Sequence, residues 1–213
     1  LTRTNSESIL GAMGSRIDPE NDYSRGVAIT SSFYPEPNTH IEPVRYGKGS
    51  NAIAYLQTLL TDGGSRRNRF GQFLRQVARN PFLLVRLLVV RQWSERTVIA
   101  LVMQNLDNSL TTYVHRFGPF KFVTSRQGHG APNPTWIPGG HKAIRGMADR
   151  LERVSGKEAI AGGTWNELFD VPMTAHFLGG APISDGPETG VIDAYQRVHG
   201  YPTMSIVDGT AVS

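Results

Sequence analysis

The 213-residue chain is 39% hydrophobic and 19% charged, a balance typical of a globular protein that buries a sizeable core. It contains no cysteine, which excludes disulfide bonds, thiolate nucleophiles and cysteine-based metal sites. The net charge of +4 does not by itself indicate a nucleic-acid binder, and no apolar run is long enough for a membrane span, which favours a cytoplasmic or peripheral membrane location over an integral one.

Two alternating segments early in the chain predict a pair of antiparallel strands. They cover residues 26–34 and 40–46, and Pro35 and Pro37 stop the first of them. Pro43 favours an edge position or a bulge for the second strand, because proline cannot donate to a ladder.

In the next part of the chain, apolar residues recur at the spacing of a helix. A first helix is predicted over residues 50–60 with Ser50 as its N-cap, and a second over residues 70–77. Pro81, which suits a first helical position, opens a third helix predicted over residues 82–93.

Residues 97–104 form a continuous apolar run of strand length, which predicts a central buried strand. Strands at 110–115 and 120–124 are expected to pair beside it. Residues 141–154 have helical spacing, and Gly156 ends this helix. This order of elements predicts an α+β fold, a mostly antiparallel sheet with helices packed on one face.

Two patterns that could indicate binding have simpler interpretations. The stretch from Gly47 to Ala52 matches the loose dinucleotide pattern G-x-G-x-x-A, but the strand before it contains Pro43 and no acidic residue ends a second apolar strand. We therefore interpret it as a turn at a helix start. The scattered histidines form no recognisable metal set, so no metal is expected.

Arginines accumulate between Arg66 and Arg96 with almost no acidic neighbours. A basic amphipathic stretch of this kind suits peripheral contact with a membrane surface. An apolar helical face also serves to pack on the protein's own sheet. Nucleic-acid binding is not expected, because aromatic residues are not regularly spaced among the arginines.

His176 stands in a different context from the other histidines. It is followed closely by Gly179 and Gly180, and paired glycines let a ligand or another backbone approach closely. A histidine so placed is a candidate functional residue.

Spaced elements follow one another in the C-terminal part of the sequence: His176 with the glycines after it, residues 193–202 and residues 206–211. In this order they resemble the glucose-methanol-choline oxidoreductase family, in particular its bacterial cholesterol-oxidase-like branch. The earlier run 101–109 looks like that branch as well. The segment of residues 3–8 also looks like that branch.

The resemblance implies that residues 1–170 form a substrate-binding domain and that residues 171–213 return to a flavin-binding domain. The family's N-terminal FAD fingerprint has no counterpart in this sequence. We therefore expect a piece of a longer FAD-dependent enzyme that oxidises a sterol or another apolar secondary alcohol. The N-terminal FAD-binding portion would be the partner of this chain, which by itself would retain no flavin and be inactive.

The resemblance also implies roles for single residues. His176 matches the imidazole that holds the substrate hydroxyl while a hydride passes to the flavin. Asp208 and Gly209 match the element that approaches the flavin, beside Gly179 and Gly180. Glu95, just before the buried strand, stands where a glutamate shifts the steroid double bond, although a lone glutamate near basic helices also suits a salt bridge.

The apolar residues of the buried strand are expected to line the sterol slot, on a face that the sequence does not determine. The competing interpretation is a non-catalytic domain that binds an apolar ligand or a membrane surface.

Overall fold

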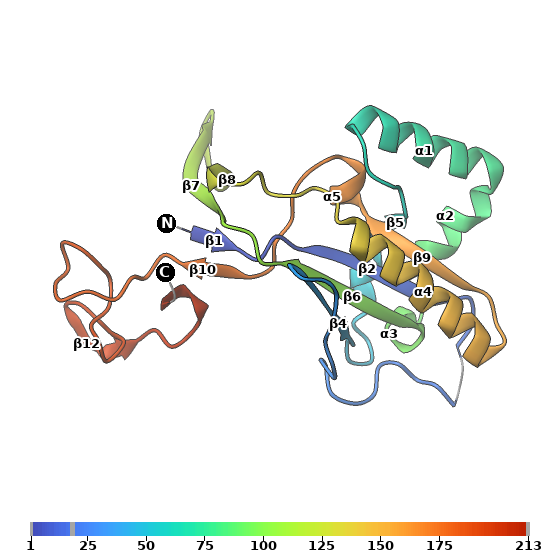
Figure 1. Ribbon diagram of the computed structural model, residues 1–213, viewed down its shortest axis with the longest axis horizontal. Helices are drawn as coiled ribbons and strands as arrows, with labels where there is room; N and C mark the ends of the chain where they lie inside the picture. The colour runs from blue at the N-terminus through green and yellow to red at the C-terminus, as the bar shows by residue number, and fades with distance from the viewer. Residues whose placement is uncertain (1, 18–19, 212–213) are drawn as a thin grey trace. The chain divides into compact units, whose positions relative to one another are not determined.

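A computed structural model describes residues 2–17 and 20–211 of the chain (Figure 1). The chain divides into two compact units. The large unit consists of residues 7–104 and 134–173, and the small unit consists of the residues up to Ser6 together with 105–133 and 174–211.

The large unit is built on a six-stranded sheet in which every pairing is antiparallel, in the order β3-β4-β6-β2-β9-β5. Its strands are β2 (Ser8–Gly14), β3 (Phe33–Glu36), β4 (Thr39–Val44), β5 (Gln57–Leu59), β6 (Thr97–Gln104) and β9 (Ala159–Thr164). The predicted central strand is confirmed, because β6 lies between β2 and β4 and is largely buried.

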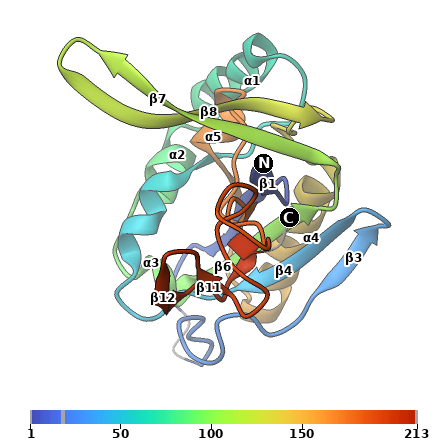
Figure 2. The ribbon, with the colours of Figure 1, turned by 90° about the vertical axis from the view of Figure 1, so that its left-hand side faces the viewer.

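Helices cover both faces of this sheet. On one face α4 (Pro138–Ser155) packs Ile144 and Ala148 against Leu10 and Val102. On the other face lie α2 (Pro81–Leu87) and α3 (Trp93–Arg96), and Figure 2 shows them on the opposite side of β6 from α4.

The α+β class is confirmed, but the expectation that the helices lie on one face is wrong. Strand β6 is continuously apolar because helices cover the sheet on both faces. Ala100 and Val102 face α4, whereas Ile99 packs with Trp93 on the other face.

Local signals predicted two helices well. In α1 (Arg66–Arg79) the Ser65 hydroxyl accepts a hydrogen bond from the Asn68 amide, which satisfies one free donor of the first turn. Helix α4 ends at Gly156, whose φ of 64° lies in the left-handed region that glycine adopts without strain.

The helix predicted over residues 82–93 is too long. Pro81 does open α2, but that helix ends at Leu87, and α3 begins only at Trp93. The β-branched Val89 and Val90 disfavour continuation, and Gln92 adopts a left-handed backbone with φ of 51°.

Two other predicted elements differ from the structure. The first strand covers Phe33–Glu36 instead of residues 26–34, and Pro35 is tolerated because β3 is an edge strand that pairs only with β4, as expected. The helix predicted over residues 50–60 is a short 3₁₀ helix η1 (Asn51–Leu56) followed by β5, because Leu59 pairs with Gly162 of β9.

The small unit holds a four-stranded sheet in the order β10-β1-β7-β8 and a separate hairpin of β11 and β12. Its elements are β1 (Thr2–Thr4), β7 (Asn108–Phe117), β8 (Phe120–Gly130), β10 (Phe177–Gly179), β11 (Arg197–Val198), β12 (Tyr201–Ser205) and the 3₁₀ helix η2 (Gly209–Ala211). Figure 2 shows β7 and β8 as a long two-stranded hairpin.

The strands predicted at 110–115 and 120–124 exist as parts of β7 and β8, but their expected place beside β6 is wrong. Both sides of β6 are already occupied, by β4 and β2, so β6 offers no free edge. The functional division at residue 171 that the resemblance implies stays a prediction.

Candidate functional site

His176 lies in the small unit, immediately before β10. Strand β10 pairs with β1 in the antiparallel register that sets Phe177 opposite Thr4 (Figure 1). The next residues outward are therefore His176 and Asn5, and their side chains meet, with Asn5 Nδ2 at 3.3 Å from His176 Nδ1.

Thr174 orients the Asn5 amide. Its hydroxyl lies 3.3 Å from Asn5 Oδ1 and 3.0 Å from the backbone oxygen of His176, and its single proton can be donated to either. With Oδ1 facing Thr174, Asn5 presents its NH₂ group to the imidazole. Because an amide nitrogen only donates, Nδ1 of His176 is then the acceptor, and a neutral ring carries its proton on Nε2.

Two successive glycines follow the histidine with left-handed backbones. Gly179 has a φ of 74° and Gly180 a φ of 99°, values that strain any residue with a side chain. Among the described residues other than Gly180 and its two chain neighbours, no atom lies within 4 Å of the point where a Cβ of Gly180 would stand. The backbone at Gly180 is therefore open to close approach by a ligand.

Asp208 and Gly209 lie against this same strand. A Cβ on Gly209 would stand 2.9 Å from Leu178 Cδ2, and the Ala181 amide donates to the Thr210 oxygen over 3.0 Å. The fold therefore brings together four residues that the sequence singled out for the cofactor, namely Gly179, Gly180, Asp208 and Gly209.

The Asp208 carboxylate is held ionised by its neighbour. Thr210 donates to Oδ1 from both its hydroxyl and its backbone amide, the latter over 2.8 Å. These hydrogen bonds, the side-chain bond first, lower the pKa of Asp208 below its ordinary value. The exposed carboxylate is an acceptor for ligand hydroxyl groups.

Glu95 belongs to the large unit, so the candidate residues are divided between the two units. It is buried in α3, where the Ser94 hydroxyl donates to Glu95 Oε2 over 2.8 Å. Within the described residues Glu95 forms no ion pair with the basic helices, so the salt bridge considered for it is not formed there.

Two apolar hollows flank β6 in the large unit. One, of about 480 Å³, lies on the α4 side and is lined by Val98, Tyr23 and Met147 among others. The other is a smaller, partly open hollow of about 40 Å³ on the opposite face, lined by Ile99, Trp93 and Met173 among others. Successive residues of β6 point to opposite faces of the sheet, so this strand supplies apolar surface to both hollows.

Comparison with known proteins connects these features. No family model matches the chain. The chain is 56% identical, over 219 aligned positions, to proteins named cholesterol oxidase from Mycobacterium tuberculosis strains CDC 1551 and H37Rv, with all of the chain and 37% of each relative covered. A cholesterol oxidase of Acinetobacter baumannii is 35% identical over 211 residues, covering 98% of the chain and 36% of that protein.

The chain is similar to cholesterol oxidases along its whole length. The resemblance to that branch, which the sequence elements around His176 indicated, is thereby confirmed. The chain spans little more than a third of the length of these cholesterol oxidases.

Sequence reasoning missed Asn5 and Thr174 as partners of His176. Asn5 is 171 residues away from the histidine, and no local pattern connects the two. Thr174 stands two residues before His176, but a single threonine near a histidine carries no signal by itself.

A buried polar network around His141 was also missed. His141 Nε2 lies 3.1 Å from Glu167 Oε2, and the Ser8 hydroxyl donates to Glu167 Oε1 over 2.6 Å. His141 Nδ1 faces Asp62 Oδ1 at 3.3 Å. Partial burial of Asp62 would raise the pKa of its carboxyl group. The hydrogen bonds and charges of Arg145 and His141 outweigh this effect, so the Asp62 pKa is lowered. The network ties α4 and α5 (Trp165–Leu168) to β2.

Within residues 2–17 and 20–211, no helix is both long and apolar enough to cross a membrane. No group of three or more histidine or acidic side chains there could hold a metal ion.

Proposed function

We propose that this chain forms the substrate-binding part of an FAD-dependent oxidoreductase that oxidises the secondary alcohol of a sterol. The observation that carries the proposal is the 56% identity of the entire chain to cholesterol oxidases. The contact between Asn5 and His176, and the open backbone at Gly180, are features that suit oxidation of an alcohol by a flavin.

Bound FAD would supply the acceptor for the hydride that leaves the carbinol carbon. His176 would hold the substrate hydroxyl through its imidazole, whose Nδ1 contacts Asn5. Imidazole suits this task since it both donates and accepts protons near neutral pH. Asn5 and Thr174 would act as positioning residues that keep the ring in one orientation.

The residues around β10 fit a flavin. Gly180 leaves its backbone accessible, and the ionised Asp208 offers acceptors to hydroxyl groups of the kind found on the ribityl chain. Gly209, the residue after Asp208, lets the backbone approach β10 closely. We propose that an N-terminal portion of the protein holds the rest of the cofactor.

Glu95 would then move a proton within the oxidised steroid. A carboxylate can take a proton from one carbon next to the new ketone and return it to another carbon, which shifts the double bond without net change in protons. The burial of Glu95, and its hydrogen bond to Ser94 in place of an ion pair, support this assignment.

The proposed reaction has a direct test in the complete protein. Anaerobic addition of cholesterol is expected to bleach the absorbance of the oxidised flavin, because the hydride has no further acceptor. A sterol whose hydroxyl is methylated is the control and should leave the spectrum unchanged. Tight sterol binding without bleaching would contradict the proposal and favour a non-catalytic apolar-ligand domain.

We place the sterol slot at the hollow lined by Trp93 and Met173. The lining is mostly apolar with few polar groups, as a sterol requires, and Met173 precedes His176 by only three residues in the chain. The hollow of about 40 Å³ would be one end of a larger slot.

Met173→Trp is expected to lower kcat/KM for sterol at least about tenfold, because a bulkier side chain would obstruct the slot. The control is Met147→Trp, which changes a half-buried methionine of the hollow on the other face. Steady-state kinetics with flavin content as a check measure both. An impaired Met147→Trp beside a normal Met173→Trp would move the slot to the α4 face and leave the proposed reaction intact.

A membrane surface is the second proposed partner. Helices α1 and α2 expose the apolar side chains of Phe70, Leu74 and Phe82 among arginines. Exposed apolar groups beside cations suit the interface of an anionic membrane, where each arginine contributes about 1 kcal/mol. A sterol resident in a membrane would then be reached from these helices.

A further inference from the structure

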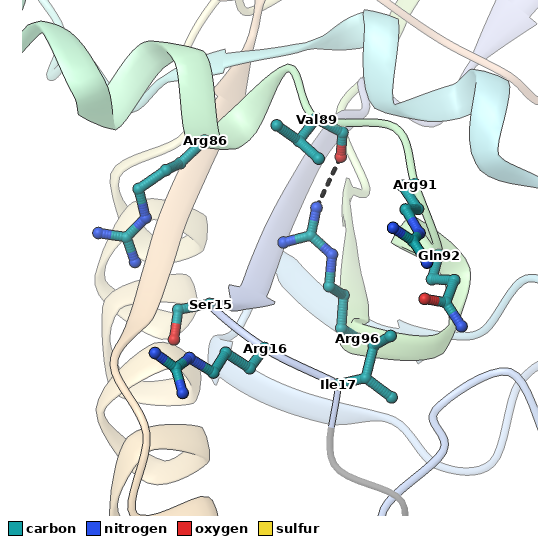
Figure 3. A pocket seen from close by; sticks show the side chains of 8 residues that line it. All are labelled: Ser15, Arg16, Ile17, Arg86, Val89, Arg91, Gln92 and Arg96. Atoms are coloured by element: carbon teal, nitrogen blue, oxygen red, sulfur yellow. Dashed lines mark hydrogen bonds between the residues drawn. The ribbon is translucent and has the colours of Figure 1, made fainter.

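A basic hollow lies in the large unit, where the chain leaves β2 and where α2 connects to α3. Its volume is about 420 Å³, and Figure 3 shows the side chains that surround it. Four arginines from two stretches of the chain line it: Arg16 from the segment after β2, and from the second stretch Arg86 of α2, Arg91 of the connection and Arg96 of α3.

The positive charge of this hollow is largely uncompensated. Among the described residues that line it, none has an acidic side chain. In the part of the chain that the structure describes, the four arginines have one carboxylate partner, Glu158, which lies 2.9 Å from Arg86. Like charges around one opening repel each other, so the four guanidinium groups favour binding of an anion there.

Arg96 is the buried arginine of this hollow. Its side chain is buried, and it donates to the backbone oxygens of Gly14 over 3.1 Å and of Val89 over 2.6 Å. These neutral acceptors hold the guanidinium in place but carry no opposing charge. Burial first, and then the charge of Arg86, lower the Arg96 pKa. A buried cation is costly unless an anion accompanies it.

We propose that this hollow binds the dianionic phosphate group of a phosphomonoester. A tetrahedral oxyanion accepts hydrogen bonds from several directions and pairs with more than one guanidinium, whereas a planar carboxylate is satisfied by one. Ser15 and Gln92 add a hydroxyl and an amide donor to the lining. The volume exceeds that of a phosphate ion and leaves room for an attached group. This inference does not depend on the oxidoreductase assignment.

The test uses the complete protein and inorganic phosphate as the probe. Calorimetric titration at constant ionic strength, adjusted with sodium chloride, is expected to show one saturable site. Arg16→Gln and Arg91→Gln are each expected to weaken binding about tenfold or more, because each removes a charge-assisted hydrogen bond. Both side chains are exposed, so neither substitution threatens the fold.

Arg75→Gln is the matched control. It removes the same charge from an exposed position of α1 in the same basic stretch, outside the hollow, and should leave phosphate affinity unchanged. No saturable binding, or equal affinity in all three variants, would overturn the proposal.

Vesicles distinguish the source of the phosphate group. Binding to phosphatidic acid vesicles that inorganic phosphate competes away, and that Arg16→Gln and Arg91→Gln weaken, would identify a lipid headgroup. Saturable phosphate binding without such competition would identify a soluble phosphomonoester. Vesicle binding weakened by Arg75→Gln and by high salt would report instead on the membrane surface proposed for α1 and α2.

Discussion

Replacing His176 with alanine in the complete protein is expected to lower the rate of flavin reduction by sterol about 10²- to 10⁴-fold. That is the usual cost of removing a positioned acid or base. Flavin content should stay normal, because Gly180 and Asp208 remain in place. Stopped-flow measurement of flavin reduction, together with the melting temperature, is the appropriate experiment.

His129→Ala is the control for this experiment. His129 is an exposed histidine of β8 in the same unit, and its hydrogen bonds to Ser109 involve only its backbone. It should reduce flavin at the normal rate. A His176→Ala protein with normal reduction and a markedly lower melting temperature would show that His176 has only a structural role.

Glu167→Ala is expected to lower the local free energy of unfolding of the large unit by about 3 kcal/mol. Two buried groups, the His141 imidazole and the Ser8 hydroxyl, would lose a hydrogen-bond partner, and each such loss costs about 1–3 kcal/mol. Native-state hydrogen exchange of β2 and β9 in the complete protein measures the effect, as a decrease in protection of about 100-fold.

Two further variants define the cause. Glu167→Gln keeps an acceptor for Ser8 and should be milder than the alanine variant. Glu152→Ala removes an exposed carboxylate of α4 and should change stability by less than about 0.5 kcal/mol. Equal protection in Glu167→Ala and Glu152→Ala would contradict a stabilising role for the network.

The sequence by itself determined the elements whose signals are local. Helix α4 follows from the apolar spacing of Ile144, Ala148 and Leu151 and from the glycine after its end. Strand β6 follows from its apolar run, and the C-terminal elements around His176 identified the relatives. Such signals are readable because neighbours in the chain remain neighbours in the folded element.

The tertiary structure decided what depends on partners distant in the chain. The segment of residues 50–60 has helical spacing, but its end becomes a strand because β9 offers Gly162 and Gly163 as pairing partners. Asn5 reaches His176, and Arg16 joins Arg86 and Arg96, only through strand pairing and packing. A periodic pattern states which face of an element is apolar but not what covers it. That is why the helices on both faces of the sheet, the orientation of the His176 ring and the basic hollow emerge only when the chain is folded.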